Sequence, residues 1–278
     1  MKITHILGTL SLFIAFACKP TTYPNRYHLK IKGSESMLEA FEALKQDFEI
    51  LQDTIEISIE GGGSRTGLMA IGENQVHIGL SSFKFNIDSI FGPDHEVIEH
   101  VIGYDGIVVI TNPSNPLLRL TDQEISDIFS GRVSNWNEIS GNNASVIPVF
   151  RNQNSGTQRF FTDYFRVDEL PDRHIIAADN AEIVSYVNKN PGAIGFIGFT
   201  YFSEGTNSLL LESGSGVFVP PTFSNLWDNS YPLKRPLHMY YREGVDQGLR
   251  GFLDYLQTER AQTVLKGHGL LPLKKLLF

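Results

Sequence analysis

Three short segments combine glycine with hydroxyl side chains, and each lies where a strand is expected to end and a helix to begin. They read "GSESM" at 33–37, "GGGSRTG" at 61–67 and "RNQNSGTQ" at 151–158. A helix N-terminus presents free backbone N–H groups and the positive end of the helix dipole, and glycine lets the backbone approach a ligand closely. Arg151 adds a planar fork that can hold two oxygens of an oxyanion. Each segment alone is also typical of a cap or turn, but together they favour binding of a small anion.

Other catalytic and metal-binding motifs do not fit the chain. "GGGSRTGLM" lacks the ending of a nucleotide-binding P-loop, and no GxSxG esterase motif occurs. The histidines of "HEVIEH" at 95–100 are five residues apart, which on a helix would place them on different faces, so we expect exposed histidines rather than a zinc site. No metal and no cofactor are therefore expected. A phosphoesterase that uses one of the serines remains a weaker alternative, because it needs a nearby base.

The composition is that of a folded protein with an acidic surface. The 278 residues are 41% hydrophobic and 19% charged, which is enough for two modest domains or one large domain. The formal net charge of −8 argues against a nucleic-acid partner, since that binding requires a basic surface. A buried site can still neutralise one small anion locally with N–H dipoles and an arginine.

The N-terminus predicts export and lipid attachment. A lysine at position 2 precedes the apolar stretch "ILGTLSLFIAFA", which is too short for a comfortable membrane span, and Ala17 precedes Cys18. This resembles the lipobox of bacterial lipoproteins, with Ala15 in place of the usual leucine; an ordinary signal peptide is the alternative. We expect a signal peptide over 1–18, with Cys18 lipidated, and a polar tether over 19–27. Cys18 is the single cysteine, so no intramolecular disulfide can form.

Hydrophobic periodicity predicts two α/β units that could position the three segments. "YHLKIKG" and "DTIEISIE" read as strands, and the apolar residues of 35–51 recur at helical spacing. A second series of strands and helices runs through "SVIPVFRNQNSGTQRFFTDYF" and "NPGAIGFIGF". Alternating strands and helices favour a parallel sheet with helices on its faces. Ligands of such sheets bind at the carboxyl ends of the strands, so we expect a cleft between the two units.

Several longer motifs extend this interpretation to a family. The sequence resembles PstS-type phosphate-binding proteins, the extracytoplasmic receptors of bacterial phosphate ABC transporters, over nearly all of the mature chain. The matching text is "IKGSESML", "GGGSRTG" before "VHIGLSS", "DGIVVITNPSNP", "LTDQEISDIFSGRVSNWNEI", "RNQNSGTQRFF" and "NPGAIGFIGF". The resemblance implies a type II periplasmic-binding-protein fold with a hinge of two crossing strands. Lobe 1 would comprise 28–107 and about 207–278, and lobe 2 about 108–206.

The resemblance also implies a function and a site. Phosphate would be buried between the lobes without covalent chemistry and passed to permease subunits by a monomeric receptor anchored outside the cytoplasmic membrane. Ser36 and the N–H of Met37 would bind it from the first helix, and Ser64 from the glycine loop. Asp105 is interpreted as either structural or ligand-contacting. The candidate phosphate-binding residues are Ser34, Ser36, Met37, Ser64, Ser82, Arg151, Ser155, Gly156 and Thr157.

One segment departs from the best-known members of this family. They carry an aspartate after "GAS", where this chain reads "GLSSFKF". Other relatives have "SSR" there, so Ser81 and Ser82 fit a second subgroup, with Phe83 or Lys84 in the place of its arginine. Another tetrahedral oxyanion, such as sulfate or molybdate, and a sensor role therefore remain alternatives. Arg65 either adds charge to the site or points into solvent.

Overall fold

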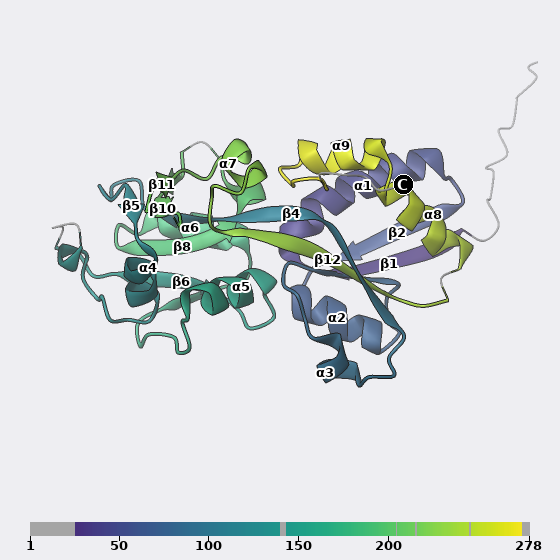
Figure 1. The fold of residues 1–278 in the computed structure, drawn as a ribbon, viewed down its shortest axis with the longest axis horizontal. Coiled ribbons are helices and arrows are strands. Elements are labelled where there is room, and N and C mark those ends of the chain that lie inside the picture. Colours follow the sequence, from purple (N-terminus) through teal and green to yellow (C-terminus); the bar gives the residue numbers. More distant parts are fainter. Residues whose placement is uncertain (1–25, 140–142, 204, 215, 245, 274–278) are drawn as a thin grey trace, which may run out of the picture.

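The computed structural model describes residues 26–139, 143–203, 205–214, 216–244 and 246–273. It has two α/β halves side by side along the long axis, joined by two long strands (Figure 1). We call the half that contains the N-terminal strands lobe 1 and the other half lobe 2. The predicted signal peptide, Cys18 and most of the tether lie outside the described residues, and Tyr27 is already the first residue of a strand.

Lobe 1 is a five-stranded part of a larger sheet, with helices on both faces. Its strands run in the order β2 (Ile55–Glu60), β1 (Tyr27–Gly33), β3 (Ile78–Ser81), β12 (Lys234–Arg242) and the first part of β4 (Val97–Thr111). β1 is parallel to both of its neighbours, and β12 is antiparallel to β3 and β4. The other elements are η1 (Glu35–Met37), α1 (Leu38–Leu51), α2 (Ser64–Gly72), α3 (Ile87–Phe91), α8 (Gln247–Leu256) and α9 (Glu259–Gly267).

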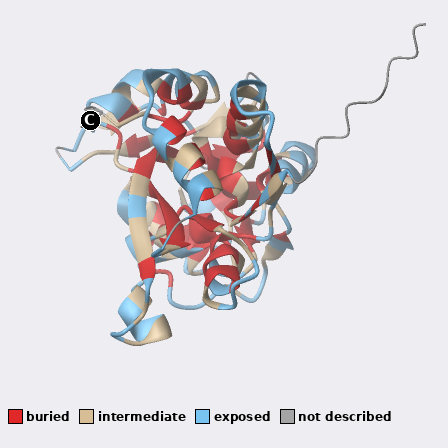
Figure 2. Ribbon diagram, turned by 90° about the vertical axis from the view of Figure 1, so that its right-hand side faces the viewer, coloured by how far each residue is buried: buried red, intermediate tan, exposed pale blue. Residues whose placement is uncertain are grey.

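The main core of lobe 1 lies under α1, α8 and α9. The three-and-four spacing of Phe41, Leu44 and Phe48 places one face of α1 on the sheet, as the periodicity predicts. Phe48 packs edge-on against Phe252 of α8, with ring centroids 5.2 Å apart. α2 and α3 cover the opposite face. Figure 2, which looks at the lobe 1 end, shows buried residues along the central strands and exposed residues on the outer helices.

Lobe 2 continues the same sheet from the second part of β4. Its strands run in the order β4, β8 (Ala193–Gly198), β6 (Ile147–Arg151) and β7 (Ile175–Ala177), and β9 (Asn207–Ser208) also pairs with β4. A small second sheet comprises β11 (Phe218–Val219), β10 (Leu210–Glu212) and β5 (Arg119–Leu120). The other elements are α4 (Asp122–Phe129), η2 (Trp136–Glu138), α5 (Gly156–Phe165), α6 (Asn180–Lys189), η3 (Phe199–Tyr201) and α7 (Phe223–Trp227).

Aromatic rings fill the core of lobe 2. Phe129 lies within 5.6 Å, centroid to centroid, of three other rings, those of Phe150, Phe161 and Phe196. α4 begins with the predicted capping box, in which the Thr121 side chain accepts from Glu124 N and the Glu124 side chain accepts from Thr121 N.

β4 and β12 form the connection between the lobes. They pair from Val97 opposite Arg242 to Gly106 opposite Lys234, and β4 then pairs with β8 from Ile107 onward. Both strands cross the junction in Figure 1. This arrangement confirms the predicted two-lobe α/β fold with a hinge of two strands. No helix among the described residues is long and apolar enough to cross a membrane.

The packing moves one predicted boundary between the lobes. We expected the chain to return to lobe 1 at about residue 207. Instead, Leu211, Leu226 and Leu233 are buried in the core of lobe 2, and β10 pairs with β5. Tyr231 anchors the segment by donating from Oη to the carbonyl of Ile107 at 2.9 Å. We therefore propose that lobe 1 resumes at β12, because the apolar residues of 207–233 lack a regular period and the buried ones among them pack in the core of lobe 2.

Candidate anion-binding site

The three glycine and hydroxyl segments meet at the interface between the lobes. β1 ends at Gly33, β3 at Ser81 and β6 at Arg151, so each carboxyl end delivers its loop to the same region. The helices that follow β1 and β6 begin at the interface, as does α2 after the glycine loop of β2. This is the position at the carboxyl ends of strands that the sequence predicts.

Lobe 1 contributes a cluster of buried serines. Ser34 Oγ donates to Ser82 Oγ at 3.0 Å, and the backbone N–H of Ser82 donates to Ser64 Oγ at 3.0 Å. All three serines are at most 2% exposed. Gly63, with φ of 97°, makes the turn into α2, and a Cβ at this position would lie 2.5 Å from the carbonyl oxygen of Asn154 in lobe 2. The glycine loop is therefore required both for the turn and for close approach of the other lobe.

Lobe 2 contributes a buried cation. Arg151 is 2% exposed, and its Nη2 donates to the carbonyl of Ala178 at 2.9 Å. Its Nε and Nη1 are buried and have no hydrogen-bond partner among the described residues. Burial lowers the pKa of Arg151, while the carboxylates of Glu35 and Asp179 oppose this shift. Since a buried guanidinium with free N–H groups is unfavourable by itself, these atoms indicate a site for an anion.

The two lobes are closed onto each other at this site. Ser36 Oγ and Thr157 Oγ1 lie 3.0 Å apart across the interface, within hydrogen-bond distance. The backbone N–H of Arg65 donates to the carbonyl of Asn154 at 3.1 Å. Gly156 lies so close to lobe 1 that a Cβ there would be 2.2 Å from Ser64 Oγ. The site residues of both lobes are therefore enclosed together, away from solvent.

A second buried cation lies where β4 and β12 meet the site. Arg235 donates from Nη2 to Asp105 Oδ2 at 2.7 Å and to Ser36 Oγ at 3.1 Å. Both members of this ion pair are fully buried. Burial raises the pKa of the Asp105 carboxyl, and the charge of Arg235 counteracts part of that shift. The pair holds Ser36 in place from the hinge, which is the structural one of the two roles expected for Asp105.

The structure places the predicted site residues at or beside this interface, and the N–H of Met37 already has a hydrogen-bond partner there. The N–H of Met37 donates to the carbonyl of Ser34 at 3.1 Å, and its side chain is buried in the core of lobe 1. The 3-10 turn of η1 uses this donor, which the sequence pattern could not show. Ser155 Oγ accepts from Gln158 N at 3.2 Å and caps α5, so it combines a cap with a place at the interface.

Sequence reasoning missed two polar residues at this interface, Arg235 and Asn180. Asn180 is fully buried at the start of α6, and its Nδ2 has no hydrogen-bond partner among the described residues. Arg235 precedes a proline within the apolar strand "RPLHMYY". The available signal for Arg235 was a charged residue inside a strand that is buried on both faces. Such a residue does not lie in a loop or at a helix start, where binding residues were sought.

Two other expectations concern residues outside the site. Arg65 and Lys84 are exposed and line a neighbouring groove instead of the buried cluster. The segment "HEVIEH" leads into strand β4 rather than a helix, and His95 Nε2 lies 3.0 Å from Asp88. Within the described part of the chain, no group of histidine, cysteine or carboxylate side chains could hold a metal ion.

Comparison with known proteins gives consistent matches over most of the chain. A family model described as "PBP superfamily domain" matches residues 19–260. Phosphate-binding protein PstS of Bacillus subtilis is 27% identical over 251 residues, covering 88% of this chain and 80% of that protein. PstS of Borreliella burgdorferi is 22% identical over 286 residues, covering 98% and 99% of the two chains.

A solved structure adds a likeness in three dimensions. It is described as a phosphate ABC transporter substrate-binding protein with bound phosphate from Clostridium perfringens. Its TM-score is 0.81 with 29% sequence identity, and the alignment covers 89% of this chain and all of the other. A phosphate transport receptor from Vibrio cholerae, at 21% identity and a TM-score of 0.75, supports the fold.

Proposed function

This chain belongs to the PBP superfamily, and from that membership and its closed site we propose that it captures inorganic phosphate for an ABC permease. The relatives from Bacillus subtilis and Borreliella burgdorferi are named phosphate-binding proteins, and the structure from Clostridium perfringens contains phosphate. The observation that carries the proposal is the buried Arg151 guanidinium, whose Nε and Nη1 have no hydrogen-bond partner among the described residues, at an interface where hydroxyls of both lobes meet.

The enclosure of the site favours a small inorganic ligand. Arg151, Ser64 and Ser155 are each at most 3% exposed, and Gly156 closes against the serines of lobe 1. These closed surfaces favour a ligand without a large substituent. The serine and threonine hydroxyls, Asn180 Nδ2 and the Arg151 fork supply the donors that the oxygens of a tetrahedral oxyanion require. Sulfate and molybdate share this geometry and are the alternatives.

We further propose that the site binds without catalysis. Within the described chain, the site hydroxyls hydrogen-bond to one another, to Arg235 and to backbone groups rather than to a histidine or carboxylate. A serine nucleophile would need such a base within reach. Binding and release are instead expected from opening and closing of the lobes about β4 and β12, which is a hinge motion.

The receptor is proposed to act as a monomer held on the outer face of the cytoplasmic membrane by lipid on Cys18. The support is the signal-peptide pattern of residues 1–18 and the family resemblance. In a bacterial host, Cys18→Ser is expected to move the protein from the membrane fraction to the soluble fraction. Retention of the variant with membranes would contradict the anchor without affecting the phosphate proposal.

Calorimetric titration tests the ligand. The chain from residue 19 onward, stripped of bound anion, would be titrated with phosphate and separately with sulfate between pH 5 and 9. We expect tight 1:1 binding of phosphate and much weaker binding of sulfate. Equal binding of both would change the assignment to a general oxyanion receptor, and binding of neither would refute it.

A further inference from the structure

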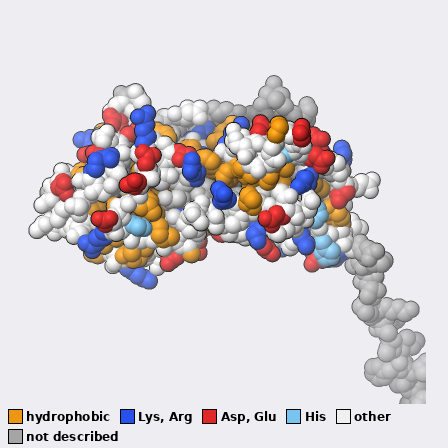
Figure 3. All heavy atoms as spheres, turned by 90° about the horizontal axis from the view of Figure 1, so that it is seen from below, with side chains coloured by type: hydrophobic (Ala, Val, Ile, Leu, Met, Phe, Trp, Pro, Cys, Tyr) orange, Lys and Arg blue, Asp and Glu red, His pale blue; other side chains and the backbone are white. Residues whose placement is uncertain are grey.

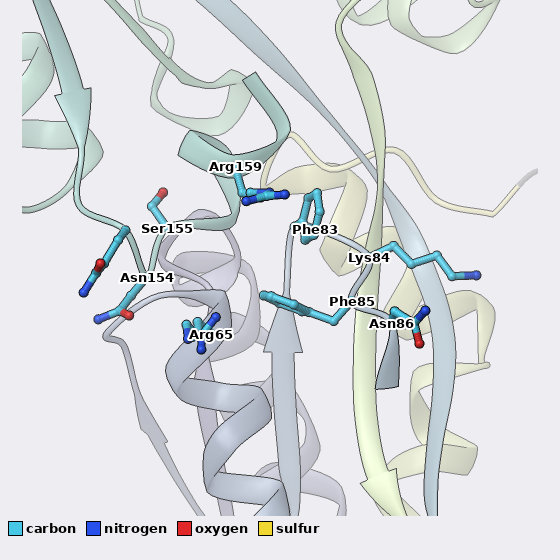
Figure 4. Close-up of a pocket in the computed structure, with 9 residues that line it drawn as sticks. Arg65, Phe83, Lys84, Phe85, Asn86, Asn154, Ser155 and Arg159 are labelled. Carbon is cyan, nitrogen blue, oxygen red and sulfur yellow. The ribbon is translucent and has the colours of Figure 1, made fainter. Parts of the chain in front are cut away.

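A groove of about 390 Å³ lies at the mouth of the closed interface, beside the buried anion site. Both lobes line it (Figure 4). Lobe 1 contributes Arg65 and residues 83–86, and lobe 2 contributes residues 153–155 and Arg159. Ser155 belongs both to this groove and to the enclosed cluster, so the groove lies directly outside the closed anion site.

The groove is cationic. Its lining includes two arginines and a lysine but no carboxylate. The guanidinium of Arg65 makes no hydrogen bond or ion pair with the residues that the structure describes, and it is exposed. Arg159 pairs with Asp163 on its own helix at 3.0 Å, but both side chains are exposed, so the pair neutralises little of its charge. Figure 3 shows basic side chains on both sides of the junction between the lobes.

Aromatic side chains form the apolar wall of the groove. Phe83 and Phe85 pack edge-on, with centroids 5.2 Å apart, and the Arg159 guanidinium lies 5.7 Å from the Phe83 ring. Apolar walls beside fixed cations concentrate their field in the space between them. In Figure 4 the Lys84 side chain points away from this space, consistent with its ion pair to Glu99 at 3.7 Å. Arg65 and Arg159 are therefore the cations that face the groove.

An anion that approaches this protein meets an unfavourable overall field. The formal net charge is −8, so a divalent anion is repelled at long range. The buried cation Arg151 is shielded behind both lobes and offers little attraction outside. A positive region at the mouth of the interface would counteract this repulsion at the place where the anion enters.

We propose that this groove is an outer anion site, at which a small divalent oxyanion is held by Arg65 and Arg159 before it enters the buried cluster. The inference rests on the proposed phosphate function and assigns two further residues to ligand capture. Because the two arginines belong to different lobes, an anion between them also reduces their mutual repulsion as the lobes close. The backbone contact from Arg65 N to Asn154 O then forms beside it.

Stopped-flow measurement of phosphate association tests the outer site. In the chain from residue 19 onward, the double variant Arg65→Gln with Arg159→Gln is compared with wild type at several ionic strengths, using inorganic phosphate. At low salt we expect the association rate constant to fall about tenfold, within the range that electrostatic steering produces. The difference should shrink as salt screens the field, and the dissociation rate constant should stay within about twofold.

A charge-matched control removes two arginines far from the groove. Arg173 is exposed near the amino end of β7, and Arg250 is exposed on α8, so Arg173→Gln with Arg250→Gln changes the net charge equally. Association in this control should remain close to wild type. If the groove variant and the control associate equally fast, the outer site is refuted.

Other outcomes distinguish failure of the outer site from failure of the proposed phosphate function. A groove variant that mainly dissociates faster would place these arginines in the inner site and also overturn the outer site. If wild type does not bind phosphate in the equilibrium titration, the proposed function itself fails. The single variant Arg65→Gln, at an exposed position without a side-chain partner among the described residues, should show a smaller slowing in the same direction.

Discussion

Replacing Arg151 by methionine should separate ligand binding from folding stability. The change removes the charge while filling part of the same volume. Nε and Nη1 are the buried donors without a partner among the described residues, so two charge-assisted hydrogen bonds to the ligand would be lost. At about 1.5–3 kcal/mol each, the loss is about 3–6 kcal/mol. Phosphate binding should therefore weaken by roughly 10²- to 10⁴-fold.

The same substitution should not destabilise the anion-free protein. Wild type buries a guanidinium whose one side-chain hydrogen bond among the described residues goes to the carbonyl of Ala178. Losing that bond costs about 1 kcal/mol, whereas removing a largely unpaired buried charge is favourable by a similar or greater amount. We expect the unfolding free energy of the anion-free variant to equal or exceed that of wild type. Saturating phosphate should reverse the order, because a concentration of about 1,000 times the wild-type Kd stabilises wild type by about 4 kcal/mol but the variant by at most about 1.4 kcal/mol.

Calorimetric titration and urea unfolding, each with and without phosphate, measure both effects. Arg173→Met serves as the matched control, because it removes an arginine from an exposed position of the same lobe. It should bind phosphate like wild type. The reasoning would be wrong if Arg151→Met bound phosphate within threefold of wild type. It would also be wrong if the anion-free variant lost several kcal/mol of stability, since Arg151 would then be a structural residue.

Three further predictions address closure, pH and the core. Gly156→Ala places a Cβ 2.2 Å from Ser64 Oγ, so closure of the lobes should become less favourable by about 1–3 kcal/mol. Phosphate titration should then show roughly 5- to 150-fold weaker binding, and X-ray scattering should show a more open shape. Burial lowers the pKa of His238 from its ordinary 6.5 despite Glu99. Below that pH the unfolded state therefore binds more protons than the folded state, so the unfolding free energy should fall as the pH drops below about 6.5. Urea unfolding should show that this fall is shallower for His238→Gln. Phe129→Ala should lower the unfolding free energy by about 3–5 kcal/mol in the same assay, because its ring is fully buried among three others.

Local sequence patterns identified the loops of the site. The glycine and hydroxyl residues at 33–37, 61–67 and 151–158 are needed where strands end and helices begin, because turning and capping are requirements of a few neighbouring residues. The periodicity of α1 and the capping box of α4 were readable for the same reason. The order of strands and helices was sufficient for the α/β class, since it depends on patterns within each element.

Contacts between segments that are distant in the chain could not be predicted from the sequence. The assignment of 207–233 to lobe 2 depends on apolar residues that find their partners about 90 or more positions earlier, such as β10 beside β5. Arg235 reaches Asp105 and Ser36 only because two hinge strands pair across the molecule. The engagement of the Met37 N–H depends on the tight geometry of η1, which no residue pattern specified.

The chain thus determined by itself which residues turn, cap and carry charge, because those properties belong to single residues and their near neighbours. Only the tertiary structure decided that Arg151 is buried, with donors that lack a partner among the described residues, while Arg65 is left outside. Burial is a property of the surrounding surfaces, and here two lobes supply them. That difference in environment makes one arginine the centre of the enclosed site and the other part of its entrance.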